Sequence, residues 1–221
     1  MVEGPALIAA AVEAGWAVEA VFVAEGEWSY VPPAGIDVFE LGPKVMERVA
    51  STEAPQAALA VVERRTAALS ALAGATFVVA ADRIGDPGNA GTILRSAEAA
   101  GADGVVFTSG SVDPFNSKVV RSSAGAIFHV PVVVDAQLAD VTALAGMRSF
   151  GASSHVGRRY TEVDLRQPVV IAVGNEAHGL ADDAPVDEWV TIPHAGRAES
   201  LNVAMATTVL AFEVARQRAG S

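Results

Sequence analysis

Three stretches of the sequence combine polar side chains with glycine directly after an apolar run. They are DRIGDPGNAGTILRSAEAAG (residues 82–101), AVGNEAHGL (172–180) and IPHAGRAESLNVAMA (192–206). In a sheet of parallel strands, ligands bind at the carboxyl ends of the strands, where such stretches would lie together. Glycine lets the backbone approach a ligand closely, and amide, carboxylate and hydroxyl groups can orient it. We therefore expect the chemistry of this chain within these three stretches.

The sequence motifs of the common α/β enzymes are missing from the chain. No GxGxxG follows a predicted strand, and neither GxxxxGK[ST] nor GxSxG occurs. These absences disfavour a nucleotide-dependent oxidoreductase, a P-loop phosphate site and a serine hydrolase. The chain has no cysteine, and its histidines at 129, 155, 178 and 194 lack the spacing of metal ligands. We expect no metal site.

Apolar patterning alternates between strands and helices and so predicts an α/β protein. The runs TFVVAAD and PVVIAVG are nearly continuously apolar, which is typical of parallel strands buried on both faces. Residues 67–75 are Ala-rich, and we expect them to join a domain of residues 1–66 to one of residues 76–221, as a linker or as a connecting helix. Predicted strands cover residues 18–23, 38–41, 57–62, 76–82, 104–108, 130–134, 148–152, 168–174 and 189–193, and predicted helices cover residues 5–14, 43–50, 89–100, 117–124, 137–145 and 200–218.

Composition indicates a folded chain that does not coat nucleic acid. Of the 221 residues, 51% are hydrophobic, which is enough apolar material for a core. The net charge of −11 argues against binding nucleic acid through bulk charge, although a local basic patch remains compatible with it. No stretch has the features of a membrane span or a signal peptide. We therefore expect no membrane partner and a cytoplasmic location.

Taken in order, the three polar stretches resemble the motifs of one family, the SpoU (TrmH-like) branch of the SPOUT-class RNA 2′-O-ribose methyltransferases. The likeness is greatest to the thiostrepton-resistance-like and ribosomal RNA members. Asn89, Gly91 and Arg95 match the first motif of that branch. Residues 174–179 match the second, Gly-x-Glu-x-x-Gly, and residues 192–203 match the third, in which Ile-Pro and a Gly precede Ser-Leu-Asn-Val. The segment SKVVRSSAGAIFHVP (117–131) also resembles the family. One motif alone would be weak, but three in order are specific.

The resemblance implies a fold that periodicity does not suggest. It is an α/β fold in which the parallel sheet of a SPOUT methyltransferase domain, residues 76–221, carries a deep trefoil knot. Residues 1–66 resemble the family's small α/β L30e-like substrate-binding domain, with EGPALIAAAVEAG at its start and TEAPQAALAVV at its end. The family usually has a basic stretch and an extra strand before that Glu-Gly pair. Because this chain begins MVEG, we expect the small domain to be either truncated or short at its start.

The implied activity is methyl transfer from S-adenosylmethionine (SAM), without a metal, to a ribose 2′-hydroxyl of RNA. Ribosomal RNA is the favoured substrate and tRNA the second. Arg95 either loses its proton and acts as the base, or stays cationic, binds the target phosphate and stabilises the developing alkoxide. Read without the family, Asn89, Ser200 and Asn202 could be helix caps and Glu176 a turn residue. The resemblance places these five residues in one catalytic cluster: Asn89, Arg95, Glu176, Ser200 and Asn202.

Further site residues follow from the resemblance. Backbone groups would hold most of the cofactor, at Ala152, Ser153, Gly174, Gly179, Ile192, Gly196 and Leu201. The expected contacts to RNA or its phosphates are Lys118, Arg121, Ser123 and Arg83, although a solvated helix face also explains residues 118–123.

The last predicted helix, LNVAMATTVLAFEVA, is apolar on more than one side. Such a helix is usually buried, here on its own sheet and against a second subunit, so we expect a homodimer. The alternative class is a non-catalytic RNA-binding module that retains the fold. The complete set of five catalytic residues favours the enzyme.

Overall fold

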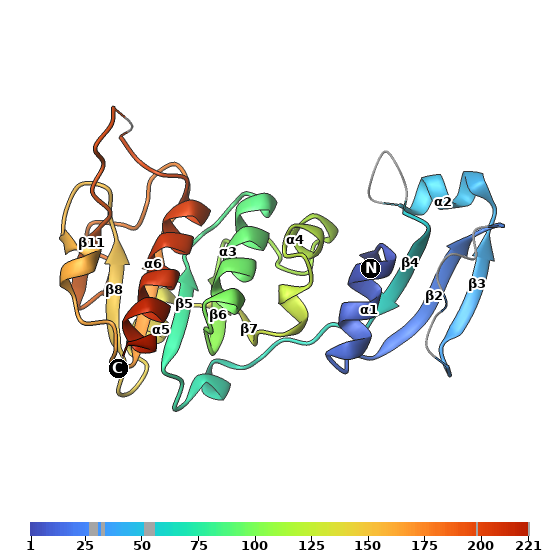
Figure 1. The fold of residues 1–221 in the computed structure, drawn as a ribbon, viewed down its shortest axis with the longest axis horizontal. Coiled ribbons are helices and arrows are strands. Elements are labelled where there is room, and N and C mark those ends of the chain that lie inside the picture. The colour runs from blue at the N-terminus through green and yellow to red at the C-terminus, as the bar shows by residue number, and fades with distance from the viewer. Residues whose placement is uncertain (27–30, 32–33, 51–55, 198, 221) are drawn as a thin grey trace.

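The structure of the chain is a computed structural model that describes residues 1–26, 31, 34–50, 56–197 and 199–220. Within these residues, a four-stranded sheet lies at one end of the molecule and a seven-stranded sheet at the other (Figure 1). The expected α/β fold class is confirmed. Residues 52–55, part of the expected end of the small domain, lie outside the described residues.

The four-stranded sheet is mixed, in the order β1-β4-β2-β3. Strands β2 and β3 are parallel, and β4 runs antiparallel to both β1 and β2. The strands and helices expected here are present, except that the two-residue β1 was not predicted. The elements are β1 (Val2–Glu3), α1 (Pro5–Glu13), β2 (Val18–Ala24), β3 (Asp37–Leu41), α2 (Pro43–Val49) and β4 (Ala58–Val62).

The seven-stranded sheet is parallel throughout, in the order β7-β6-β5-β10-β8-β11-β9. Strand β10 lies between β5 and β8, although β8 precedes it along the chain. The strands are β5 (Phe77–Ala81), β6 (Gly104–Thr108), β7 (Val132–Ala136), β8 (Arg148–Ala152), β9 (Arg158–Arg159), β10 (Val169–Val173) and β11 (Glu188–Thr191). The helices are α3 (Pro87–Ala99), α4 (Ser117–Ser122), α5 (Leu138–Thr142) and α6 (Val203–Ala219), with 3-10 turns η1 (Leu69–Leu72), η2 (Ala126–Phe128) and η3 (Tyr160–Glu162).

Alternate residues of the central strands point to two separate cores, as the period of a β-strand requires. Phe77 and Val79 of β5 belong to a cluster that includes Ile93 of α3 and Leu210 of α6. Val78 of β5 belongs to the second cluster, with residues of η1 and α5. Figure 1 shows α6, α3 and α4 side by side over the first of these faces. Both faces are covered, which explains the continuous apolar runs in the sequence.

Of two helix starts for which the sequence suggested a cap, one differs from the expectation and one agrees with it. Helix α3 begins at Pro87, and the carboxylate of Asp86 accepts a hydrogen bond from the backbone amide of Asn89 at 2.8 Å. The prediction that Asn89 caps this helix is wrong, because proline is well suited to the first helical position and the helix starts two residues earlier. Helix α6 is capped by Asn202, as expected, since its side chain accepts from the amides of Ala204 and Met205.

The joining segment is neither a free linker nor a regular helix. Ala67 forms a parallel bridge with Val133 of β7, and its amide donates to the Val132 carbonyl at 2.8 Å. Residues 69–72 then make the turn η1, in which Leu72 is buried. The segment is therefore held against the edge of the seven-stranded sheet.

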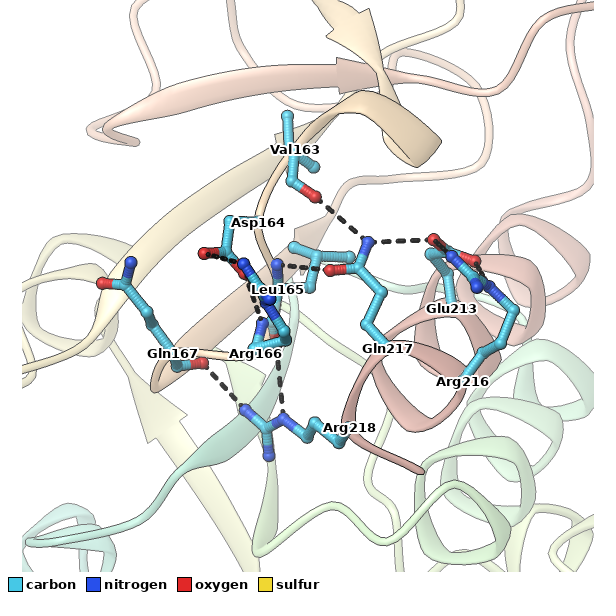
Figure 2. Close-up of polar contacts among 9 residues, drawn as sticks. All are labelled: Val163, Asp164, Leu165, Arg166, Gln167, Glu213, Arg216, Gln217 and Arg218. Carbon is cyan, nitrogen blue, oxygen red and sulfur yellow. Dashed lines mark hydrogen bonds and ion pairs between the residues drawn. The ribbon is translucent and has the colours of Figure 1, made fainter. Parts of the chain in front are cut away.

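The C-terminal end of α6 is fixed by polar contacts rather than by apolar packing alone (Figure 2). Gln217 donates from Nε2 to the Val163 carbonyl at 3.0 Å and accepts from the Leu165 amide at 2.9 Å. Glu213 is buried on the same helix and receives two hydrogen bonds from the Arg216 guanidinium, each at 2.7 Å. The Gln217 contacts attach α6 to the loop that precedes β10, whereas the Glu213–Arg216 pair lies within the helix.

The two sheets are joined by a packed junction around Trp16. Its Nε1 donates to the carbonyl of Phe128 at 3.0 Å, and the two rings meet edge to face at 5.2 Å. Arg65 lies over the Trp16 ring at 5.6 Å. Gly125 has φ of +94°, and a Cβ there would lie 3.2 Å from Ala10 Cβ. The hydrophobic cluster beneath α3 continues into α1. The elements around the four-stranded sheet are therefore packed against those around the seven-stranded sheet.

Candidate active site

Hydrogen bonds connect all three polar stretches at the carboxyl edge of the seven-stranded sheet. The Glu176 carboxylate, just after β10, accepts from the amides of Gly85 and Asp86 at 3.1 and 2.9 Å, and from Asn89 Nδ2 at 3.0 Å. Asn202 Nδ2, at the start of α6, donates to Asn89 Oδ1 at 2.9 Å. Residues from three strand ends thus form one network, as the sequence predicted from their positions after parallel strands.

The donors around Glu176 determine its protonation. Burial raises its pKa, but hydrogen bonds from the Asn89 side chain and from the backbone amides of Asp86, Glu176 and Gly85 outweigh burial and lower the pKa below its ordinary value. The group is therefore a carboxylate at neutral pH, with its oxygens occupied by donors. Such a group orients its neighbours and is poorly suited to giving or taking a proton.

Asn175 is a functional candidate that sequence reasoning missed. Its Nδ2 donates to the Arg83 carbonyl at 2.9 Å, and its Oδ1 accepts from the Ala177 amide at 2.9 Å. It therefore ties the turn after β10 to the loop after β5, beside the contacts of Glu176. Its position between two motif residues, Gly174 and Glu176, is the signal that could have identified it.

The glycines of the second motif are required by the turn itself. A Cβ on Gly174 would lie 2.1 Å from the backbone of Gly179 and Leu180, and Gly179 has φ of +68°. The carbonyl of Asn175 accepts from the Gly179 amide at 2.8 Å, which closes the turn. The structure therefore supports a tight turn at these two glycines directly.

A cavity of about 670 Å³ lies beside this network, at the ends of β8, β10 and β11 and against the start of α6. Its volume is within the range of small-molecule sites, roughly 300–1,000 Å³. Apolar walls formed by Leu180, Trp189 and Leu210 suit a flat ring system. Eight of the residues expected at the site line it: Ala152, Ser153, Gly174, Glu176, Gly179, Ile192, Ser200 and Leu201. Gly196 is not among the lining residues.

The polar lining holds further groups that sequence reasoning left as structural or exposed. His155, His178 and His194 line the cavity, as do Asp182 and Glu199. Nε2 of His194 is buried and has no hydrogen-bond partner, the one side-chain nitrogen or oxygen of this kind among the described residues.

Arg95 lies apart from the cavity lining, on the exposed side of α3. Asn89 and Arg95 are six residues apart, about 9 Å along a helix. Within the described part of the chain, the Arg95 side chain forms no hydrogen bond and no ion pair. The structure therefore gathers Asn89, Glu176 and Asn202 into contact and leaves Arg95 available to a substrate.

The expected RNA contacts fall into three situations. Lys118 and Arg121 line a second cavity of about 330 Å³, between α4 and the start of α3. Arg83 is about half exposed, and its Nε donates to the Asp82 carboxylate at 2.9 Å. Ser123, in contrast, is fully buried, and its hydroxyl donates to the Val120 carbonyl at 2.7 Å. The expectation for Ser123 is wrong, and its neighbour Ser122 lines the second cavity instead.

Two further expectations concern absent features. Within the described residues, no group of histidine and acidic side chains could hold a metal ion. None of the described helices combines the length and apolar character that crossing a membrane would require.

A cavity at the carboxyl edge of a parallel sheet, walled by three polar loops, is the arrangement of an α/β ligand-binding enzyme. The SpoU rRNA Methylase family matches residues 76–212, and the MRM3-like substrate binding domain matches residues 1–60. The chain belongs to the SpoU rRNA Methylase family.

Individual relatives agree with this assignment. The chain is 36% identical over 185 residues to the 23S rRNA (guanosine(2553)-2'-O)-methyltransferase RlmP of Bacillus subtilis, covering 81% of this chain and 73% of that protein. It is 35% identical over 193 residues to the 23S rRNA (uridine(2479)-2'-O)-methyltransferase of Streptomyces viridochromogenes, covering 79% and 65%. The chain thus spans between about two thirds and three quarters of these relatives.

Two solved structures share the whole fold. The SpoU methyltransferase AviRb from Streptomyces viridochromogenes, in complex with AdoMet, superimposes with a TM-score of 0.87 at 30% identity, covering 100% of this chain and 90% of that one. An AdoMet-bound rRNA methyltransferase from Sinorhizobium meliloti gives 0.84 at 31% identity, covering 97% and 85%.

Proposed function

We propose that this chain transfers a methyl group from S-adenosylmethionine to a ribose 2′-hydroxyl of ribosomal RNA. The observation that carries the proposal is the network of Asn89, Glu176 and Asn202 beside the 670 Å³ cavity. Membership of the SpoU family and two AdoMet-bound structural neighbours support the cofactor. The named relatives act on guanosine or uridine in 23S rRNA, so the target base is left open.

The residues of the cavity would bind the cofactor and exclude water from its reactive end. When bound, S-adenosylmethionine supplies an electrophilic methyl group on a sulfonium. Backbone groups near Ser153, Ile192 and Leu201 would hold the nucleoside, since these residues line the cavity. Glu176 and Asn89 act as positioning residues, because their bonds fix the loop that leads into α3 relative to the cavity wall.

Arg95 is proposed to act on the RNA. In this transfer the oxygen of the ribose hydroxyl would form a bond to the methyl carbon, the carbon–sulfur bond would break to release S-adenosylhomocysteine, and the hydroxyl proton would pass to solvent water. An exposed guanidinium stays cationic in proteins. Arg95 is exposed, so of its two possible roles we favour phosphate binding and stabilisation of the developing alkoxide over proton removal.

RNA is proposed to lie across both domains. Lys118 and Arg121, together with Arg83, offer positive charge near the start of α3 in a chain whose net charge is −11. Residues 1–66 form the proposed substrate-binding domain, residues 67–75 the joining segment and residues 76–221 the methyltransferase domain. We further propose that the last third of the chain forms the trefoil knot, that the protein is a homodimer and that it acts in the cytoplasm.

The decisive experiment compares RNA from cells with and without this protein. Mapping 2′-O-methylated positions in ribosomal and transfer RNA should reveal one ribosomal position that loses its methyl group in the deletion strain and regains it with the wild-type gene. Restoration should fail with Arg95→Ala. If a tRNA position loses its methyl group instead, tRNA replaces ribosomal RNA as the proposed substrate. Unchanged methylation in both RNAs would favour the non-catalytic RNA-binding module.

A further inference from the structure

Arg83 has a strained backbone at the carboxyl edge of the seven-stranded sheet. Its φ is +52°, in the left-handed region that favours glycine. Glycines aside, the other described residues in this region are Ala124 and Asp135. Aspartate tolerates the conformation because its short side chain can form local hydrogen bonds, but a long arginine side chain has no such compensation. Strained conformations of this kind cluster at functional sites. The chain thus keeps an arginine where glycine would be less strained.

Hydrogen bonds hold Arg83 in this conformation on both sides. Its amide donates to Thr108 Oγ1 at 3.0 Å, and its carbonyl accepts from Asn175 Nδ2 at 2.9 Å. Thr108 Oγ1 also donates to Asp82 Oδ1 at 2.8 Å, and Asp82 Oδ2 accepts from Arg83 Nε at 2.9 Å. Asp82 and Thr108 are both buried. Both oxygens of the buried carboxylate are therefore occupied, and Arg83 is tied to the end of β6 and to the turn after β10.

The Arg83 guanidinium is fixed at one nitrogen and open at the other two. The pair with Asp82 uses Nε, and Nη1 and Nη2 donate no hydrogen bond to any described residue. The Arg83 side chain is 53% exposed, whereas that of Asp82 is 8% exposed. A guanidinium held from behind by a buried carboxylate presents its remaining N–H groups as a rigid fork. Such a fork fits two oxygens of one phosphate.

The Arg83 side chain lies against the loop after β6, apart from the cofactor cavity. Its Cγ lies 3.6 Å from the position that a Cβ on Gly110 would take. Strand β6 lies on one side of β5, and β10, β8 and β11, whose ends surround the cavity, lie on the other. The cavity and the Arg83 guanidinium therefore occupy different halves of the same edge, with the network of Asn89, Glu176 and Asn202 beside the cavity.

We propose that Asp82 and Thr108 are positioning residues that hold the Arg83 guanidinium for one phosphate of the RNA backbone. The RNA strand then crosses the carboxyl ends of β5 and β6, while the cofactor occupies the ends of β8, β10 and β11. The inference rests on the proposed function, because it takes RNA as the substrate. A fixed arginine fork lets a chain with a net charge of −11 contact RNA at a chosen phosphate, without bulk positive charge.

The test measures the Kd for an in vitro transcript of 23S ribosomal RNA by filter binding, from about 50 to 200 mM potassium chloride. Arg83→Gln removes the charge, and Thr108→Val removes the hydroxyl while keeping the shape. Arg166→Gln is the matched control, because Arg166 also donates from Nε to a carboxylate but precedes β10, at the opposite edge of the sheet. Every variant should keep the wild-type Kd for S-adenosylhomocysteine, since none of these residues lines the cavity.

For Arg83→Gln we expect about tenfold weaker RNA binding, as for a lost contact to a charged group, and a salt slope smaller by about one. Thr108→Val should weaken binding about threefold, and it should add nothing in the Arg83→Gln background, because the hydroxyl acts through Arg83. Arg83→Gly should bind RNA as weakly as Arg83→Gln but unfold at a higher temperature, because glycine adopts the left-handed conformation without strain. Arg166→Gln should match wild type.

Wild-type RNA affinity and salt slope in Arg83→Gln or Arg83→Gly would overturn the inference. An equal effect of Thr108→Val with and without the Arg83 side chain would overturn the positioning role. If Thr108→Val does not fold, Arg83→Lys decides, since lysine keeps the charge without the fork. Binding as tight as wild type in Arg83→Lys would count against the proposal. These outcomes leave methyl transfer by the wild-type chain untouched, whereas a wild-type chain that neither binds nor methylates ribosomal RNA would overturn the proposed function.

Discussion

Arg95 is the side chain on which the proposed chemistry depends most. Because it is exposed and outside the cofactor cavity, its replacement should separate chemistry from cofactor binding. Loss of a group that stabilises charge in the transition state typically costs about 10²–10³ in rate. We expect Arg95→Ala to lose at least about a hundredfold in methyl transfer to ribosomal RNA, while the Kd for S-adenosylhomocysteine stays within about twofold.

Two comparisons make this prediction specific. Arg95→Lys should also lose most activity, because lysine lacks the planar fork that binds phosphate in two places. Arg166→Ala is the matched control: Arg166 is exposed and paired with Asp164, and it precedes β10 at the opposite edge of the sheet from the cavity. Near-normal transfer by either Arg95 variant in a radiolabel assay would contradict the assignment.

A second prediction for a single residue concerns Glu176 and the dependence of the free energy of unfolding on pH. Its pKa in the folded chain is lowered, so its ionised form stabilises the fold above the ordinary pKa of about 4.5. That contribution is lost as the pH falls through the lowered folded pKa. Urea unfolding of Glu176→Gln should therefore show a lower free energy than wild type at pH 7, with a difference that shrinks as the pH drops below about 4.5.

A matched variant checks that the effect belongs to this network. Glu98→Gln changes an exposed carboxylate of α3 that makes no hydrogen bond among the described residues. It should follow the wild-type pH profile. A constant difference between Glu176→Gln and wild type from pH 3 to pH 7 would show that the carboxylate charge is not what the network uses.

At the scale of elements, Gly91 sets the approach of α3 to α4. A Cβ on Gly91 would lie 1.9 Å from Ser122 Oγ and 2.8 Å from the Ser122 carbonyl carbon. The second contact involves backbone, so a side-chain rotation cannot relieve it. Overpacking of this kind costs about 1–3 kcal/mol, and we expect Gly91→Ala to lower the free energy of unfolding by at least that amount.

Denaturant unfolding measures this loss, with Gly196→Ala as the control because a Cβ there meets nothing within 4 Å. A stable Gly91→Ala variant would mean that the two helices can separate without cost. Activity should fall along with stability, since α4 carries Lys118 and Arg121 and its displacement would move the second cavity.

Elements were predictable from the sequence where burial determines the apolar pattern. The exposed face of a short helix and the order of strands in the sheet were not. The apolar runs of β5 and β10 located both strands within a residue or two. Periodicity does not distinguish Ser122 from Ser123, because a helix as short as α4 does not define its exposed face in the sequence. The position of β10 between β5 and β8 depends on long-range pairing, which local patterns do not encode.

At the scale of the whole molecule, one side of α6 carries exposed apolar residues that suit the proposed homodimer. Helix α6 presents Met205 and Phe212, seven residues apart and therefore on one side, with 62% and 48% of their surface exposed. Large exposed apolar side chains in line suit an interface between two copies of a chain. Sedimentation at micromolar concentration should show a dimer for wild type and a monomer for Phe212→Glu, because a carboxylate would be buried there without a partner.

The control places the same charge on another exposed apolar residue. Val45→Glu alters α2 in the small domain, and it should leave the sedimentation coefficient unchanged. A monomeric wild-type protein would refute the dimer. If the Phe212→Glu variant remains a dimer, the interface lies elsewhere than on this side of α6.

The place of β10 in the sheet imposes an order on how the chain reaches its native state. During synthesis β5 and β8 emerge first, and β10, which pairs with both, follows later. If β5 and β8 met directly, they would close the gap that β10 must enter. A nascent chain must therefore keep its central β-strand edges apart until residue 173 is available. Long-range parallel pairing already slows folding. If β5 and β8 pair before β10 is available, that pairing must break again before the native sheet can form.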